Sequence, residues 1–406
     1  MDFTRRSVLG TGISAAAGLA TGYAHAAGEP VRIGVLNDQS GPYSASMGRG
    51  SVIAANMAVE DFGPTVLGRP IEIMAADHQN SVDIGTSIAR QWCDTGGVGL
   101  IIDIGHSAIA LGVQDIVRAR NKIAIYTAVG TTQITEQACS PNGFSWCYDA
   151  YALCNGLVSA MAGRELKTWF LLVTDYAFGH SLEEEVEAAV GRNNGRVVGR
   201  VRHPEHTNDF SAYILQALAA KPQPQVLGLL NSAEDMANSL KQATEFGFRQ
   251  NGRQVAAPLV NITDVHSMGL ELAQGLTFLI AFVWDRTDAT RRFSERFMAR
   301  HKAPPTMPQA AVYSGTLHYL RAVAAAGTSD TDPVIAAMRA NRVRDVYAED
   351  GWIRADGRMM HDMYLVQVKA PNKSKGPWDY SDILSTVPAD KAFRLLSESK
   401  CPLVHS

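Results

Sequence analysis

The sequence has few cysteines, and their spacing is wrong for metal or redox chemistry. No two of the five form a C-x-x-C pair, which excludes zinc ribbons and thioredoxin-like motifs. The segment His203-Pro204-Glu205-His206 contains a proline and has the composition of a loop, which favours a solvated turn over a metal-binding pair. We therefore expect no metal site. The cysteines are Cys93, Cys139, Cys147, Cys154 and Cys401.

Glycine motifs for nucleotide binding or hydrolysis are also missing. The nearest match to G-x-G-x-x-G begins at Gly48 and Gly50, but Ile53 stands where the third glycine belongs, and no phosphate-binding G-x-x-x-x-G-K-[ST] exists. Two segments begin the G-x-S-x-G pattern of α/β hydrolases, but Ile109 and Glu183 occupy the final glycine positions. No nucleophile, base and orienting group can be assembled, so we expect neither catalytic residues nor a cofactor.

The chain has no excess of one charge. Its 37 basic and 40 acidic side chains give a net charge of −3, which argues against a nucleic-acid partner.

Beyond the N-terminus there is no long apolar run. One such run, from Val8 to about Ala20, lies between Arg5-Arg6 and Ala24-His25-Ala26 and is too short to span a membrane. This order of basic, apolar and small residues is that of an export signal, and the paired arginines resemble a twin-arginine signal. We predict a signal peptide over residues 1–26 and export to the periplasm.

Short apolar strands and amphipathic helices alternate through the rest of the chain. This alternation at regular spacing is typical of parallel α/β sheets with right-handed crossovers. About 380 residues remain after the signal, which fits two domains. The blocks lie on either side of residue 150, so we predict two doubly wound lobes. The main predicted strands are 31–36, 70–75, 100–104 and 123–126 in the first block, and 168–173, 196–202, 226–230 and 255–260 in the second.

Two cysteines have loop-like surroundings. Cys139 lies near Pro141 and Gly143, and Cys401 precedes Pro402. Exported proteins can form disulfides, so these two are the preferred pair. The odd number of cysteines leaves at least one thiol free or paired with another chain.

Several segments, in this order, resemble the leucine/isoleucine/valine-binding protein family of periplasmic ABC-transporter receptors. The last of them is similar to the subset of that family that takes amino acids or amides. The resemblance runs from about residue 31 to 388. The segments are Val31–Leu36 with Ser40–Tyr43, Thr174–Gly179, Thr207–Ser211, Lys241–Gly247 and Ser374–Tyr380.

The resemblance implies a type I periplasmic-binding-protein clamshell with a three-crossing hinge. We expect crossings near residues 148, 280 and 350. The first lobe then comprises 27–148 and 280–350, and the second comprises 149–279 and 351–406 with the C-terminal tail. A small organic solute is expected between the lobes, at the C-terminal ends of the strands, and hinge closure is read by the membrane permease of an ABC importer. A monomer is expected. A sensory ligand-binding module is the alternative.

In the first lobe, the resemblance implies that Ser107 and the backbone around Ala128, Gly130 and Thr131 grip a ligand carboxylate. A helix start offers unpaired N–H groups and partial positive charge for such an anion. The alternative for Ser107 is a helix N-cap. Tyr43, on the first loop, could reach the mouth of the cleft.

In the second lobe, Tyr176 and Phe178 match an aromatic loop of the family, and we expect Tyr176 to face the cleft while Phe178 packs into the lobe core. Asn231 and Asp264 lie just past predicted strand ends. Trp284 and Tyr151, near the hinge, are candidates for the cleft wall or for packing between the lobes.

These candidates favour a carboxylate or amide ligand with an apolar or aromatic body. In amino-acid binders of the family, an acid in the second lobe meets the ligand's ammonium, but the matching position here is Val260 or Asn261. Asp264 is the only nearby acid. A branched-chain amino acid is the alternative ligand, and it requires Asp264 to reach the cleft.

Overall fold

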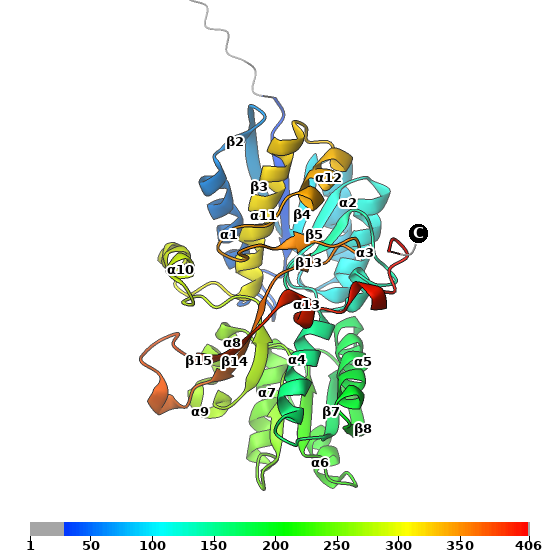
Figure 1. Ribbon diagram of the computed structural model, residues 1–406, viewed down its shortest axis with the longest axis vertical. Coiled ribbons are helices and arrows are strands. Elements are labelled where there is room, and N and C mark those ends of the chain that lie inside the picture. The colour runs from blue at the N-terminus through cyan, green and yellow to red at the C-terminus, as the bar shows by residue number, and fades with distance from the viewer. Residues whose placement is uncertain (1–27, 405–406) are drawn as a thin grey trace, which may run out of the picture.

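The computed structural model describes residues 28–404, which form two lobes (Figure 1). The predicted signal peptide lies outside these residues. The first lobe is built on one sheet with the strand order β2-β3-β1-β4-β5-β6, in which all neighbours except β2 and β3 are parallel. Its strands are β1 (Val31–Asn37), β2 (Thr65–Val66), β3 (Arg69–Asp77), β4 (Val98–Asp103), β5 (Ile123–Tyr126) and β6 (Gly143–Ser145).

Helices cover both faces of this sheet because successive strand side chains point to opposite sides. Ile33 and Val35 of β1 belong to one core cluster with residues of α1 and α11, while Leu36 belongs to another with residues of α2 and α3. The helices here are α1 (Gly48–Phe62), α2 (Val82–Asp94), α3 (Ser107–Ala119), α10 (Asp288–His301), α11 (Met307–Ala326) and α12 (Thr331–Ala340), with the short 3-10 helix η1 (Thr132–Ile134).

The second lobe repeats this design with a parallel sheet in the order β10-β9-β7-β8. Leu171 of β7 packs in the cluster that contains α4 and α5, and Leu172 packs in the cluster that contains α6 and α7. The elements are β7 (Thr168–Thr174), β8 (Arg196–His203), β9 (Val226–Leu230), β10 (Gln254–Ala256), α4 (Ala150–Ala162), α5 (Ala177–Arg192), α6 (Ser211–Ala219), α7 (Ala233–Glu245), α8 (Ile262–Met268) and α9 (Leu270–Ala273).

The predicted α/β class with two parallel-sheet lobes is thus confirmed. A smaller antiparallel sheet, β11-β14-β15, accompanies the second lobe. The strand predicted over 255–260 is shorter than expected, because β10 ends at Ala256 and the chain turns into a loop before α8. The added strands are β11 (Thr277–Ile280), β14 (Met363–Val368) and β15 (Ser381–Val387), with η2 (Pro371–Lys373) between the last two.

The third crossing between the lobes lies farther along the chain than residue 350, where we expected it. Strand β12 (Trp352–Ile353) pairs with β13 (Met359–Met360), and Arg358 bridges to Ser145 in the first lobe. This hairpin keeps the chain beside the first lobe until about residue 360, so the segment 351–360 does not join the second lobe.

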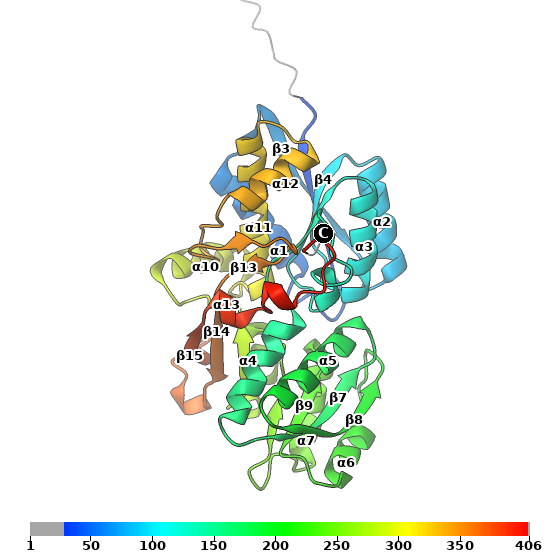
Figure 2. The same cartoon turned by 45° about the vertical axis from the view of Figure 1, so that its right-hand side comes forward.

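The C-terminal segment also differs from the predicted division, which left it in the second lobe. Helix α13 (Ala389–Ala392) contacts α4, and the chain then passes through η3 (Leu396–Glu398) back to the first lobe, where the C-terminus lies (Figure 2). Cys401 forms a disulfide with Cys139, which confirms the preferred pair. The other cysteines, Cys93, Cys147 and Cys154, are buried free thiols.

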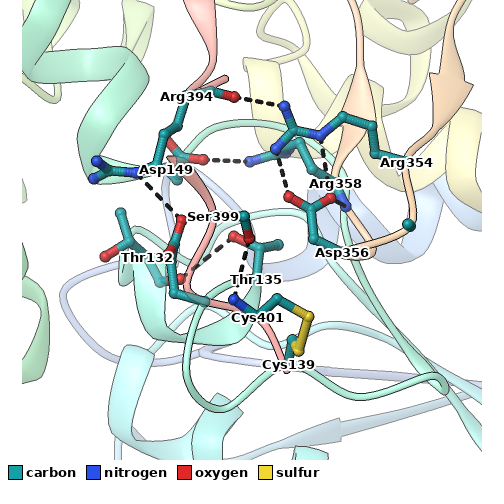
Figure 3. Close-up of polar contacts among 12 residues, drawn as sticks. Thr132, Thr135, Cys139, Asp149, Arg354, Asp356, Arg358, Arg394, Ser399 and Cys401 are labelled. Carbon is teal, nitrogen blue, oxygen red and sulfur yellow. Dashed lines mark hydrogen bonds and ion pairs between the residues drawn. A yellow bond between two sulfur atoms is a disulfide. The ribbon is translucent and has the colours of Figure 1, made fainter. Parts of the chain in front are cut away.

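Residues 388–404, here called the C-terminal strap, therefore connect the lobes a further time. The Arg394 guanidinium pairs with Glu136 of the first lobe, at 3.2 Å, and with Glu185 of α5. Nearby, Arg358 pairs with Asp149 at 3.1 Å (Figure 3). No helix within residues 28–404 is long and apolar enough to cross a membrane.

Candidate functional site

A cavity lies between the two lobes and is called the first cavity below; its free space is about 440 Å³ when the part open to solvent is included. Its walls are the loops at the C-terminal ends of parallel strands, where ligands of α/β sheets gather. The first lobe and the first crossing contribute Tyr43, Ser46, Met47, Gly105, Ser107, Ala128, Gly130 and Tyr148; the second lobe contributes Tyr176, Phe178, Ser232, Ala233, Leu259, Asn261 and Asp264.

The first-lobe wall combines the small residues Gly105, Ser107, Ala128 and Gly130 with larger side chains. Ser107 begins α3, and its Oγ accepts a hydrogen bond from the backbone N–H of Thr131 (3.3 Å). The N-cap of α3 is His106, whose Nδ1 accepts from the N–H of Ile109 (3.4 Å). Ser107 is therefore not the cap, and its hydroxyl hydrogen is available to a ligand oxygen.

The second-lobe wall is aromatic. Tyr176 precedes α5, stacks on His106 with ring centroids 4.8 Å apart, and places its hydroxyl 3.1 Å from that of Tyr43. Burial raises the pKa of both phenols, which keeps them neutral. Phe178 borders the cavity and is also part of the lobe core, so the predicted division of roles holds for Tyr176 and only in part for Phe178.

The same wall contains a buried acid. Asp264 lies in the first turn of α8, and its Oδ2 accepts a hydrogen bond from the backbone N–H of Asn261 (2.7 Å). Burial raises the pKa of Asp264 to about 6. No lysine or arginine lines the first cavity, so this carboxyl group has no cationic partner there.

Several contacts join the lobes around the cavity. Besides the two tyrosine hydroxyls and the stack of Tyr176 on His106, Thr131 Oγ1 lies 2.9 Å from Ser181 Oγ, and His106 Nε2 lies 3.5 Å from a carboxylate oxygen of Glu205. Near this edge, burial raises the pKa of Asp235 to about 6. The lobes are thus closed upon each other.

The comparisons with known proteins agree with this architecture. A sequence model described as periplasmic binding protein matches residues 30–377. The chain belongs to this family. Members of the periplasmic binding protein family are receptors rather than enzymes: they bind small molecules and deliver them to the permeases of ABC transporters.

Solved periplasmic binding proteins share the fold closely. One from Burkholderia mallei is 43% identical with a TM-score of 0.89, covering 92% of this chain and 99% of that one. A branched chain amino acid ABC transporter periplasmic ligand-binding protein from Burkholderia xenovorans is 37% identical with a TM-score of 0.83, covering 92% and 100%. A Leu/Ile/Val-binding protein homolog 6 of Brucella melitensis is 23% identical over 76% of this chain and 80% of its own length.

In this periplasmic binding protein, the structure brings seven of the predicted site residues to the first cavity and leaves four away from it. Asn231 is buried in the second lobe, where its amide donates to His203 Nε2 (3.2 Å) and Ser239 Oγ (3.3 Å). Tyr151 packs against the guanidinium groups of Arg192 and Arg394. Thr131 lies behind Ser107, and Trp284 lines a neighbouring cavity. The seven are Tyr43, Ser107, Ala128, Gly130, Tyr176, Phe178 and Asp264.

The candidate residues omitted Tyr148, a cavity-lining ring at the first crossing. Ser232 and Asn261, which the sequence places with Asn231 and Asp264 just past predicted strand ends, line the cavity as well. Ser232 lines it while Asn231 turns away, because neighbouring residues in extended chain point in opposite directions. Within residues 28–404, no group of three or more His, Cys, Asp or Glu side chains is arranged to hold a metal ion.

Proposed function

We propose that this chain is the substrate-binding receptor of an ABC importer and captures an α-amino acid with an apolar side chain in the periplasm. The observation that carries the proposal is that Ser107 and Asp264 line the same cavity from opposite lobes. The hydroxyl of Ser107 and the start of α3 suit the ligand's carboxylate. The carboxylate of Asp264 suits its ammonium.

The unpaired state of Asp264 supports the ammonium in particular. A buried charge is costly unless a counter-charge accompanies it, and the first cavity has no basic side chain. A ligand ammonium would supply that counter-charge. The preference from sequence for a ligand without an amino group depended on having no acid at this wall. The 37% identical relative is named for branched-chain amino acids, in line with the proposal.

The remaining walls favour an apolar body. Met47, Tyr148, Phe178 and Leu259 surround the space beside the two polar groups.

Four aromatic rings line the cavity, and this supports a second candidate, an aromatic carboxylic acid that stacks on them. Asp264 would then be protonated and donate a hydrogen bond, which a pKa of about 6 allows at mildly acid pH.

Calorimetric titration with leucine and with benzoate at pH 7.5 and pH 5.0 separates the candidates. Leucine binding needs ionised Asp264, so its affinity should fall below pH 6. Benzoate binding favours the protonated form, so its affinity should rise there. Leucine binding that is lost in Asp264→Asn supports the proposal. Benzoate binding that survives in Asp264→Asn, with no leucine binding in the wild type, overturns it in favour of the aromatic acid.

Both walls of the cavity come from one chain, so we propose that a monomer binds the ligand and that a permease reads the closed form. Small-angle scattering should show a smaller radius of gyration with ligand than without. Leucine uptake that depends on this protein would support transport over the alternative, a sensory module.

A further inference from the structure

A second cavity adjoins the first, and its free space is about 580 Å³ when the part open to solvent is included. Like the first, it has walls from both lobes, so it takes shape when the lobes close. The second lobe contributes Val260, Asn261, Ile262, Val265, Phe278, Ile280, Trp378 and Tyr380, while Phe282, Trp284, Pro305, Thr306 and Met307 come from the second crossing and the loop before α11.

The first turn of α8 and the residues before it separate the two cavities. Leu259 and Asp264 line the first cavity, Val260 and Val265 line the second, and Asn261 lines both. The partition is therefore a single layer of residues at Asn261.

The opposite side of the partition is equally thin. Ser46 lines the first cavity and Thr306 lines the second, and the hydroxyl of Thr306 donates to the carbonyl of Ser46 (2.6 Å). Ser46 and Thr306, which are neighbours in space but not in sequence, thus face different cavities on this side.

The Asn261 side chain is a fixed part of this partition. The residue is only 7% exposed and forms a capping box with Asp264 at the start of α8, in which the Asn261 side chain faces the backbone N–H of Asp264. The wall that the two cavities share is therefore held in place by the helix start.

Two aromatic residues close the second cavity from outside. Trp378 and Tyr380 lie on the loop between β14 and β15, and His266 of α8 stacks on Trp378 at 4.1 Å and lies 2.7 Å from the Tyr380 hydroxyl. Trp284 Nε1 donates to the carbonyl of Trp378 (3.2 Å). An ion pair between Lys369 and Asp379 fixes the base of the loop. The loop is thus an ordered lid over a chamber that is lined by aromatic and aliphatic side chains together with Asp285 and Asp379.

We propose that the second cavity is a subsite for the far end of the same solute, a large apolar or aromatic group. This rests on the proposed function, in which the carboxylate end lies at Ser107. The rings of Trp284, Trp378 and Tyr380 suit an aromatic tip. The two ends of the solute would meet beside Asn261, which lines both cavities. The natural solute is then longer than leucine.

Titration calorimetry with leucine, phenylalanine and 4-phenylphenylalanine tests this subsite. In the wild type, 4-phenylphenylalanine should bind about tenfold more tightly than leucine, because its outer ring is buried. Ile280→Phe places a ring in the second cavity and should abolish that advantage without changing leucine affinity. Ile383→Phe makes the same substitution on the exposed face of the same small sheet and should behave as the wild type.

Trp378→Ala removes the lid and should also reduce binding of the longer solute alone, so the inference does not depend on one variant. Thermal denaturation verifies that each variant is folded. The subsite is overturned if the wild type binds 4-phenylphenylalanine less tightly than leucine. It is also overturned if Ile280→Phe still binds 4-phenylphenylalanine more tightly than leucine. In both cases the proposed function stands. If no amino acid binds, benzoate and biphenyl-4-carboxylate form the second series. If neither series binds, both proposals fail.

Discussion

The two lobes build opposite walls of the first cavity from different materials. Each wall carries two aromatic rings, but only the first-lobe wall has Gly105 and Gly130, which bring backbone to the surface. Only the second-lobe wall has an ionisable carboxyl group, that of Asp264.

This difference suggests a division of labour. Backbone groups at strand and helix ends can hold a carboxylate or carbonyl oxygen whatever the rest of the ligand is. The acid of the second lobe sets the charge that the rest of the ligand must match. The choice between an amino acid and another carboxylate should therefore depend most on Asp264, and closure of the lobes on the glycines of the first lobe.

The largest expected effect on binding is that of Asp264→Asn. Removal of the one charge that can face a ligand ammonium should weaken leucine binding by about 100-fold or more, since breaking a buried ion pair leaves the other charge unpaired. Calorimetry at pH 7.5 measures the loss. A leucine affinity that stays within a few-fold of wild type would remove the acid from the ligand's contacts.

The same substitution should have the opposite effect on the stability of the ligand-free protein. Because burial raises the pKa of Asp264 to about 6, the folded protein holds the proton more tightly than the unfolded chain. The ionised group therefore costs stability above pH 6, by about 3 kcal/mol, and costs little below pH 4. Asp264→Asn should unfold at a higher temperature than wild type at pH 7.5 and at nearly the same temperature at pH 4. A variant that is less stable at pH 7.5 would contradict this.

The next largest effect is expected at Gly130, where the two lobes come into contact. A β-carbon at Gly130 would lie 2.4 Å from two ring atoms of Phe178 in the opposite lobe, closer than atoms can approach. Gly130→Ala should weaken binding about 10- to 100-fold by holding the lobes apart. Gly191→Ala, on an open surface of α5, is the matched control. Adding Phe178→Ala to Gly130→Ala should restore part of the closure in scattering measurements; no recovery would mean that the two residues do not meet.

Ser107→Ala should cost about tenfold in affinity for leucine, the usual value of a hydrogen bond to a charged group. The Thr131 N–H loses its acceptor at the same time, so a small drop in unfolding temperature should accompany the change. Comparable losses for leucine and for leucinamide would show that the hydroxyl meets the carbonyl oxygen rather than the charge.

Tyr43→Phe should have the smallest effect, a reduction of affinity of about threefold. The hydroxyl contact with Tyr176 joins the lobes, but the ring that lines the cavity remains. Tyr43→Ala removes both and should cost more. Equal effects of the two substitutions would assign the whole contribution to the hydroxyl.

The sequence was sufficient for the layers and the general place of the site, since strand and helix periodicity determine which faces are buried. It could not determine which of two neighbouring residues turns towards the cleft. Asn231 and Ser232 both follow β9, yet Asn231 turns inward to His203 while Ser232 lines the cavity. Tyr151 is similar: its place on α4 aims it at Arg394 of the strap, a residue 243 positions later in the numbering that no local pattern connects to it.

The lobe boundaries after residue 350 could not be predicted either, because they depend on pairing between segments that are far apart in the sequence. The bridge between Ser145 and Arg358 joins segments more than two hundred residues apart. Only the two loop cysteines signalled that the chain returns late to the first lobe. They predicted the disulfide but not the route that residues 388–404 take to reach it.

The disulfide between Cys139 and Cys401 spans 262 residues and turns most of the protein into a covalent ring. The whole second lobe, all three hinge crossings and the helices α10 to α12 lie within this ring. In the loop-entropy description, closing a loop of that size raises the free energy of the unfolded chain by about 5.6 kcal/mol. The ring also protects the protein against cleavage: a single cut by a protease anywhere inside it leaves both pieces attached. Nicked protein should therefore migrate as one band until a thiol reductant is added, and a receptor damaged in one loop can still keep its two lobes as a single molecule.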